Sequence, residues 1–105
     1  MKHFTIHDIQ PGGSYLMPGY FADGKVTRGG VYVFKPGENS HPEARHTHEV
    51  TEVFIIVQGT GTLPIDGVDY PVKTGDVWLV EPGEDHHLTS SEDDVMVAVW
   101  YKMDR

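Results

Sequence analysis

The sequence lacks cysteine altogether, is poor in basic residues and contains no long apolar run. Without cysteine, disulfide frameworks, thiol catalysis and cysteine-ligated zinc are all excluded. Lysine and arginine together number 8 against 16 acidic residues, and the net charge of −8 argues against nucleic-acid binding, which needs clustered basic side chains. No apolar run approaches the roughly 20 residues of a membrane-spanning helix. We therefore expect neither a nucleic acid nor a membrane as a partner.

The length of the chain predicts one domain. Two domains within 105 residues would each be too small to bury a stable core, so we assign residues 1–105 to a single domain. The first 13 residues contain no apolar segment of the kind found in signal peptides. Together with the absence of cysteine, this favours a cytoplasmic location.

Glycine and proline divide the chain into short β-rich segments. There are 12 glycines and 7 prolines, and no stretch shows the apolar spacing of a long amphipathic helix. The expected strands cover residues 3–6, 14–17, 25–35, 43–48, 52–58, 60–65, 68–72, 77–80, 86–90 and 95–102. The dipeptide Asp66-Gly67 predicts a tight hairpin between two of them. This pattern indicates an all-β antiparallel sandwich or barrel.

A group of polar residues with metal-ligating chemistry lies in the middle of the chain. His46 and His48 are two residues apart, and Glu52 follows four residues after His48. On a strand, residues i and i+2 point to the same face, so the two imidazoles would project side by side. Two imidazoles and a carboxylate on one side suit a divalent metal that prefers nitrogen and oxygen ligands. The alternative is a pair of histidines on a solvated face.

A further histidine offers a fourth ligand. His86 follows a Pro-Gly turn, and a strand starting there could bring its imidazole to the same place. Four protein ligands leave room for water or substrate on a six-coordinate metal, and an open position is typical of catalytic sites. His87 would point the other way and replace His86 only at a bulge. His41, in the preceding loop, is either a substrate contact or a solvated loop histidine.

Two ordered motifs resemble those of the cupin family. The spacing of His46, His48, Glu52 and Gly59 is similar to the first cupin motif, and the segment from Gly75 through the Pro-Gly turn to His86 resembles the second. The resemblance covers about residues 31–101. It implies a double-stranded β-helix, or jelly roll, with His46, His48, Glu52 and His86 as ligands of one divalent metal near the barrel mouth. The usual occupants would be iron, manganese, nickel or zinc.

The family resemblance leaves the reaction open, because cupins include oxygenases, isomerases, lyases and non-catalytic binding proteins. The set of three histidines and one glutamate resembles that of small cupin dioxygenases. This implies a metalloenzyme that oxidises a small oxygenated or carboxylate-bearing metabolite with O2. Metal-assisted isomerase or lyase chemistry, and small-molecule binding without turnover, are the alternatives.

Two further expectations concern the pocket and the assembly. Arg28 and Tyr70 are candidates for polar contacts in the pocket, and the Arg28 guanidinium suits an anionic substrate. Aromatic and apolar side chains should fill the rest of the barrel interior. Because exposed sheet edges tend to pair with another chain, we expect a homodimer formed through the N-terminal strands.

Overall fold

The computed structural model describes residues 1–15, 17, 19–21 and 24–104. Its strands are β1 (Lys2–Thr5), β2 (Lys25–Phe34), β3 (Thr51–Gln58), β4 (Thr60–Ile65), β5 (Val68–Lys73), β6 (Asp76–Val80), β7 (Thr89–Ser90) and β8 (Met96–Asp104). A single turn of 3-10 helix, η1 (Ile6–Asp8), follows β1. Within these residues, no helix has the length and apolar character that crossing a bilayer requires.

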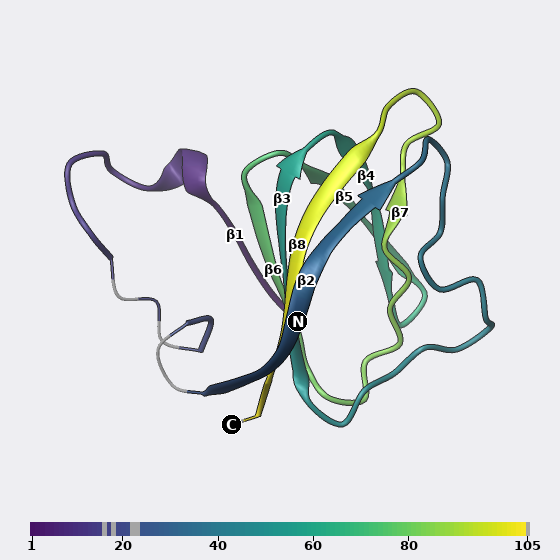
Figure 1. Ribbon diagram of the computed structural model, residues 1–105, viewed down its shortest axis with the longest axis horizontal. Coiled ribbons are helices and arrows are strands. Elements are labelled where there is room, and N and C mark those ends of the chain that lie inside the picture. Colours follow the sequence, from purple (N-terminus) through teal and green to yellow (C-terminus); the bar gives the residue numbers. More distant parts are fainter. Residues whose placement is uncertain (16, 18, 22–23, 105) are drawn as a thin grey trace.

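The strands form two antiparallel sheets that pack as a jelly-roll β-barrel. The larger sheet has five strands in the order β1-β6-β3-β8-β2, and the smaller has three in the order β5-β4-β7. In Figure 1 the long strands β2 and β8 run alongside each other, and the loop after β2 swings out on the side where β7 lies. The expected all-β fold is therefore confirmed.

The main core lies between the two sheets because the strands alternate in the side chains that they bury. On β2, Tyr32 and Phe34 face inward, whereas Val31 and Val33 face outward and are each 61% exposed. Side chains from both sheets, including Phe54 of the larger and Leu63 of the smaller, meet in one apolar cluster. This alternation has the period of two that a half-buried strand requires.

A second, smaller cluster covers part of the outer face of the larger sheet. Val53, Val77 and Leu79 are almost fully buried there, and Phe4 and Tyr20 from the N-terminal part of the chain pack against them. The Tyr101 hydroxyl, on the neighbouring strand β8, donates a 2.7 Å hydrogen bond to the Tyr20 carbonyl. Tyr20 is thus fastened to the barrel by apolar contact and by this hydrogen bond.

The predicted Asp66-Gly67 hairpin joins β4 to β5. Both residues have positive φ angles, 48° and 82°, as a two-residue hairpin turn of this kind requires. The turn also supports a neighbouring loop, because the Asp85 amide donates to the Asp66 carboxylate at 2.8 Å and the Asp66 amide donates to the Asp85 carbonyl at 2.9 Å.

Two of the expected strands are wrong. Ser14, Tyr15 and Met17 lie outside any strand, and Leu16 is outside the described residues. Residues 43–48 form an irregular segment, because their backbone groups bond to another loop and not to a strand of either sheet. The expected strand over 86–90 shortens to β7, and His86 before it makes only an isolated bridge to Ile65. The remaining expected strands match observed ones with small changes at their ends.

Candidate metal centre and its cavity

Hydrogen bonds between two loops bring the candidate ligands together. The loop before β3 contains His46 and His48, and the loop between β6 and β7 contains His86. The His86 amide donates to the His46 carbonyl at 3.0 Å, and the Gly83 amide donates to the His48 carbonyl at 2.9 Å. The Asp85 carboxylate accepts from the His46 amide at 2.7 Å. These bonds fix the two loops side by side although neither segment is a regular strand.

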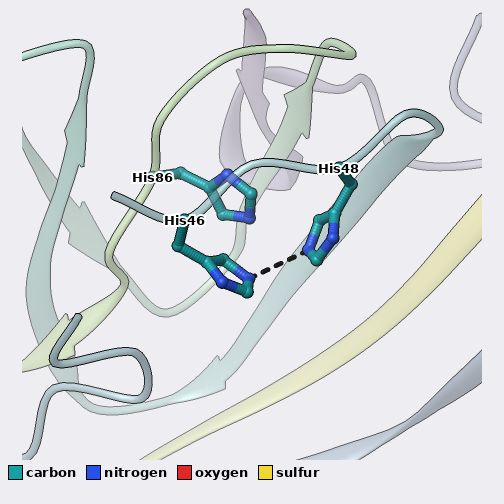
Figure 2. Close-up of side chains that lie close together, drawn as sticks. All are labelled: His46, His48 and His86. Atoms are coloured by element: carbon teal, nitrogen blue, oxygen red, sulfur yellow. Dashed lines mark hydrogen bonds between the residues drawn. The ribbon is translucent and has the colours of Figure 1, made fainter. Parts of the chain in front are cut away.

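The three imidazoles point toward one another, as Figure 2 shows. One ring nitrogen from each of His46, His48 and His86 lies within 4.8 Å of the others. The Nε2 atoms of His46 and His48 are 3.0 Å apart. Glu52, on the inner face of β3, joins the group: its Oε1 atom is 2.9 Å from Nε2 of His86 and 3.2 Å from Nε2 of His48. All four residues proposed from the sequence therefore converge.

Outer hydrogen bonds orient two of the rings. Nδ1 of His86 donates to the Glu84 carbonyl at 2.9 Å, and Nδ1 of His46 is 2.8 Å from a Glu43 carboxylate oxygen. A proton held at Nδ1 leaves the Nε2 lone pair free for a metal, and such partners are typical of metal-ligating histidines. The donor set of three Nε2 atoms and one carboxylate thus fits a divalent transition metal.

The protonation of the cluster also fits metal binding. Burial lowers the pKa of His48 to about 4, with Lys102 acting in the same direction, so this imidazole is neutral at pH 7. Burial alone would raise the pKa of Glu52, but the hydrogen bond from His86 and the nearby positive groups lower it overall. Burial opposes protonation of His86, yet its bonds to Glu52 and the Glu84 carbonyl raise its pKa. A proton shared between Nε2 of His86 and Glu52 would have to leave when a metal binds these two residues.

The cluster forms one wall of a 300 Å³ cavity inside the barrel. His48 and Glu52 face this space, and most of the other walls are aromatic or aliphatic. The lining residues are Arg28, Tyr32, Phe34, Ser40, His41, His48, Glu52, Phe54, Leu88, Ala98, Trp100 and Lys102. A largely apolar pocket with a few convergent polar groups is the usual form of a small-molecule site.

The structure settles several alternatives left open by the sequence. The His87 ring points elsewhere: its Nδ1 donates to the His41 carbonyl and its Nε2 is 2.8 Å from the Asp85 carboxylate. Arg28 lines the cavity as expected. Tyr70 does not line it, and packs against Trp78 with ring centroids 5.7 Å apart.

Sequence reasoning undervalued His41 and missed Lys102, both of which line the cavity. The His41 ring stacks on that of His46 with centroids 3.4 Å apart, and burial lowers its pKa. Its position in the loop just before the histidine pair was the available signal. Nothing in the sequence alone indicated that Lys102 would face inward beside Glu52.

Comparison with known proteins identifies the family. A profile described as the cupin domain matches residues 30–102, so the chain belongs to the cupin family. This agrees with the resemblance found in the two sequence motifs.

Solved structures share the fold. A protein from Thermotoga maritima, described as a predicted oxalate decarboxylase, has a TM-score of 0.69 at 24% identity over 77% of this chain and 69% of its own. A cupin protein from Bacteroides fragilis has a TM-score of 0.65 at 20% identity over 70% of this chain and 62% of its own. A mutant of salicylate 1,2-dioxygenase from Pseudoaminobacter salicylatoxidans, in complex with gentisate, has a TM-score of 0.60 at 15% identity over 69% of this chain and 18% of its own. These similarities establish the barrel and leave the reaction undetermined.

Proposed function

We propose that this cupin is a metal-dependent enzyme acting on a small oxygenated or carboxylate-bearing molecule. In this proposal His46, His48, Glu52 and His86 hold one divalent transition metal, either iron, manganese, nickel or zinc. The observation that supports it best is the convergence of three imidazoles and a buried carboxylate at the wall of a 300 Å³ cavity. A metal centre next to a ligand-sized space is the arrangement that catalysis at a metal requires.

The chain's own residues would bind and shield the substrate. A bound metal would supply Lewis acidity or redox chemistry next to the open space. His48 and Glu52 face that space, whereas His86 is fully buried behind them. Phe34 and Phe54 form apolar walls that limit water around a bound substrate. Exclusion of water strengthens the electrostatic interactions between the metal centre and a charged substrate.

We place O2-dependent oxidation first among the reactions. This choice rests on the similarity of the three-histidine, one-glutamate set to that of small cupin dioxygenases. One of the structurally similar proteins is itself a salicylate 1,2-dioxygenase, although at 15% identity that likeness concerns the fold alone.

A second candidate is metal-assisted isomerase or lyase chemistry, and the position of His41 favours it. Such reactions need a group that accepts or donates a proton beside the metal. His41 lines the cavity, and its lowered pKa keeps the imidazole neutral and able to accept a proton at pH 7. Small-molecule binding without turnover is the third candidate, and it differs from both by the absence of any product.

Oxygen uptake separates these candidates. Iron-loaded and manganese-loaded protein would be incubated with a panel of small carboxylates, phenols and hydroxy acids in an oxygen-electrode chamber, with products followed by mass spectrometry. Oxidation predicts substrate-dependent O2 consumption that His86→Ala abolishes and the exposed control His7→Ala leaves intact. Product formation without O2 consumption would support isomerase or lyase chemistry, and binding with no product would leave the binding protein.

The assembly and the location complete the proposal. We propose one cupin domain over the whole chain, working in the cytoplasm as a homodimer. Strands β1 and β2 form the two edges of the larger sheet. The outward-facing Val31 and Val33 on β2 are each 61% exposed, and pairing with a second copy would cover them. Light scattering of the wild type at micromolar concentration should give twice the mass of one chain. Val31→Glu should lower the measured mass toward that of the monomer. A wild type with the mass of one chain would contradict the proposal.

A further inference from the structure

Two basic side chains and the candidate metal ligand Glu52 lie in one row across the larger sheet. Arg28 on β2 is paired in register with Lys102 on β8, and Lys102 is paired with Glu52 on β3. Residues directly opposite in antiparallel strands point to the same face. All three line the cavity, and a register irregularity between Val26 and Arg28 adjusts the strand just before this row. The row therefore places Lys102 next to the candidate ligand Glu52 and places Arg28 one strand further away.

Within the part of the chain that the structure describes, neither cation forms a close ion pair with a carboxylate, although Lys102 is near enough to Glu52 to lower its pKa. Among the described residues, no carboxylate lies within 4.0 Å of the charged nitrogens of either Arg28 or Lys102. The Lys102 ammonium lies over the Trp100 ring instead, 5.9 Å from its centroid. Like charges directly opposite on neighbouring strands destabilise a sheet. Glu52, on the other side of Lys102, offsets part of this charge, and an anionic ligand in the cavity would offset the rest.

A bound metal would increase the imbalance. A divalent ion, Arg28 and Lys102 would together contribute four positive charges, and ionised Glu52 would offset only one of them. The remaining three positive charges would face a space whose other walls are mostly apolar. An anionic ligand would offset part of this charge, and carboxylate oxygens suit both a guanidinium and a divalent metal.

The rest of the cavity indicates the shape of that ligand. Aromatic side chains line the same cavity as the basic pair, namely Tyr32, Phe34, Phe54 and Trp100. Gly30, between Arg28 and Tyr32 on the inward-facing side of β2, has no side chain, and a Cβ there would lie 3.4 Å from the Trp100 indole. The volume of 300 Å³ is at the lower end of the range for ligand sites. A small flat molecule fits these walls better than a long or highly hydrated one.

We propose that the cavity selects a small carboxylic acid with a flat, apolar body, such as an aromatic acid, and that Arg28 and Lys102 bind its carboxylate. The ring lies among the aromatic walls and the acid group lies at the basic row beside the metal centre. This inference rests on the proposed function for the identity of the cavity as the substrate site. Anion selection by the basic pair is testable separately from metal binding.

Paired probes test the charge preference. Benzoate and its neutral analogue benzamide have nearly the same shape, and their binding would be measured by calorimetry on metal-free and on zinc-loaded protein. The proposal predicts that benzoate binds at least about tenfold more tightly than benzamide in both forms, since a charge-assisted hydrogen bond contributes about 1.5 to 3 kcal/mol. Equal binding of the two probes, or no binding of either, would overturn it.

Matched variants assign the preference to residues. Arg28→Gln and Lys102→Gln should each raise the benzoate Kd about tenfold and leave the benzamide Kd unchanged. Lys25→Gln removes the same charge from an exposed position on β2 that does not line the cavity, and it should leave both constants unchanged. Thermal melting checks that all three variants are folded. If Lys25→Gln matches the other two, the effect is general surface charge and the proposal fails.

The same data separate this inference from the proposed function. A chain that binds no metal, yet prefers benzoate through Arg28 and Lys102, would retain the anion site and lose the metalloenzyme. A chain that binds zinc stoichiometrically but does not distinguish benzoate from benzamide would retain the metal centre and lose the anion site.

Discussion

Removing the carboxylate behind His46 should weaken metal binding while leaving the fold intact. Glu43 is not a proposed ligand, and its Oε1 atom is 2.8 Å from Nδ1 of His46. Its side chain is 47% exposed, and surface pairs of this kind contribute little to folding stability. Loss of a partner that orients a ligating histidine typically lowers metal affinity about 10–100-fold. Because water reaches Glu43, we expect Glu43→Ala to lie near the tenfold end, and Glu43→Gln, which keeps an acceptor oxygen, to lose less.

Competition with a chromophoric zinc chelator at pH 7.5 would measure these affinities. Glu49→Gln is the matched control, because Glu49 is an exposed acid in the same loop that is not part of the cluster. Melting of the metal-free proteins should give the same Tm for all variants. Wild-type zinc affinity in Glu43→Ala would refute the assignment of His46 as an oriented ligand. An equal loss in Glu49→Gln would show that surface charge alone is responsible.

Three further predictions concern pH and packing. Zinc affinity should fall at least about tenfold per pH unit below pH 6. The raised pKa of His86 keeps a proton on the cluster in this range, whereas His48, with a pKa of about 4, stays neutral. A zinc affinity that does not change with pH would contradict this. Burial raises the pKa of Tyr101 to about 12, whereas a tyrosine in the unfolded chain has a pKa of about 10. The stability that the neutral Tyr101 hydroxyl contributes below pH 10 should therefore be lost as the pH rises toward 12. Urea unfolding should show a smaller loss in Tyr101→Phe than in the wild type, because Tyr20 and Tyr32, whose pKa values are also raised, remain. Leu63→Ala, at a fully buried core position, should reduce the free energy of unfolding by about 2–5 kcal/mol, and a loss below 1 kcal/mol would mean that the core is looser than the structure shows.

Most of the strands could be predicted because the apolar pattern and the turn residues agree. The Asp66-Gly67 turn fixed the β4–β5 hairpin, and the apolar run in residues 53–57 lies in β3. The segment 43–48 was wrong as a strand for a physical reason. Its backbone partners are in the loop ending at His86, and that loop is distant in sequence, so no local pattern could reveal the pairing.

The convergence of the four candidate ligands was predictable from the sequence, whereas their surroundings were not. The spacing of His46, His48 and Glu52 survived the loss of the expected strand, because hydrogen bonds between two loops orient the rings instead. The cavity walls depend on strand register, which sets Arg28 opposite Lys102. Register follows from the packing of the whole barrel, so the basic pair could be found only in the folded structure.

Metal content of untagged protein, purified without a nickel column, tests the central claim most directly. Elemental mass spectrometry of the wild type should give close to one transition-metal ion per chain. His46→Ala and His86→Ala should lose the metal, whereas His7→Ala, far from the cluster in sequence and exposed, should retain it. A wild type that contains no metal and takes up none from iron, manganese, nickel or zinc salts would contradict the metal centre.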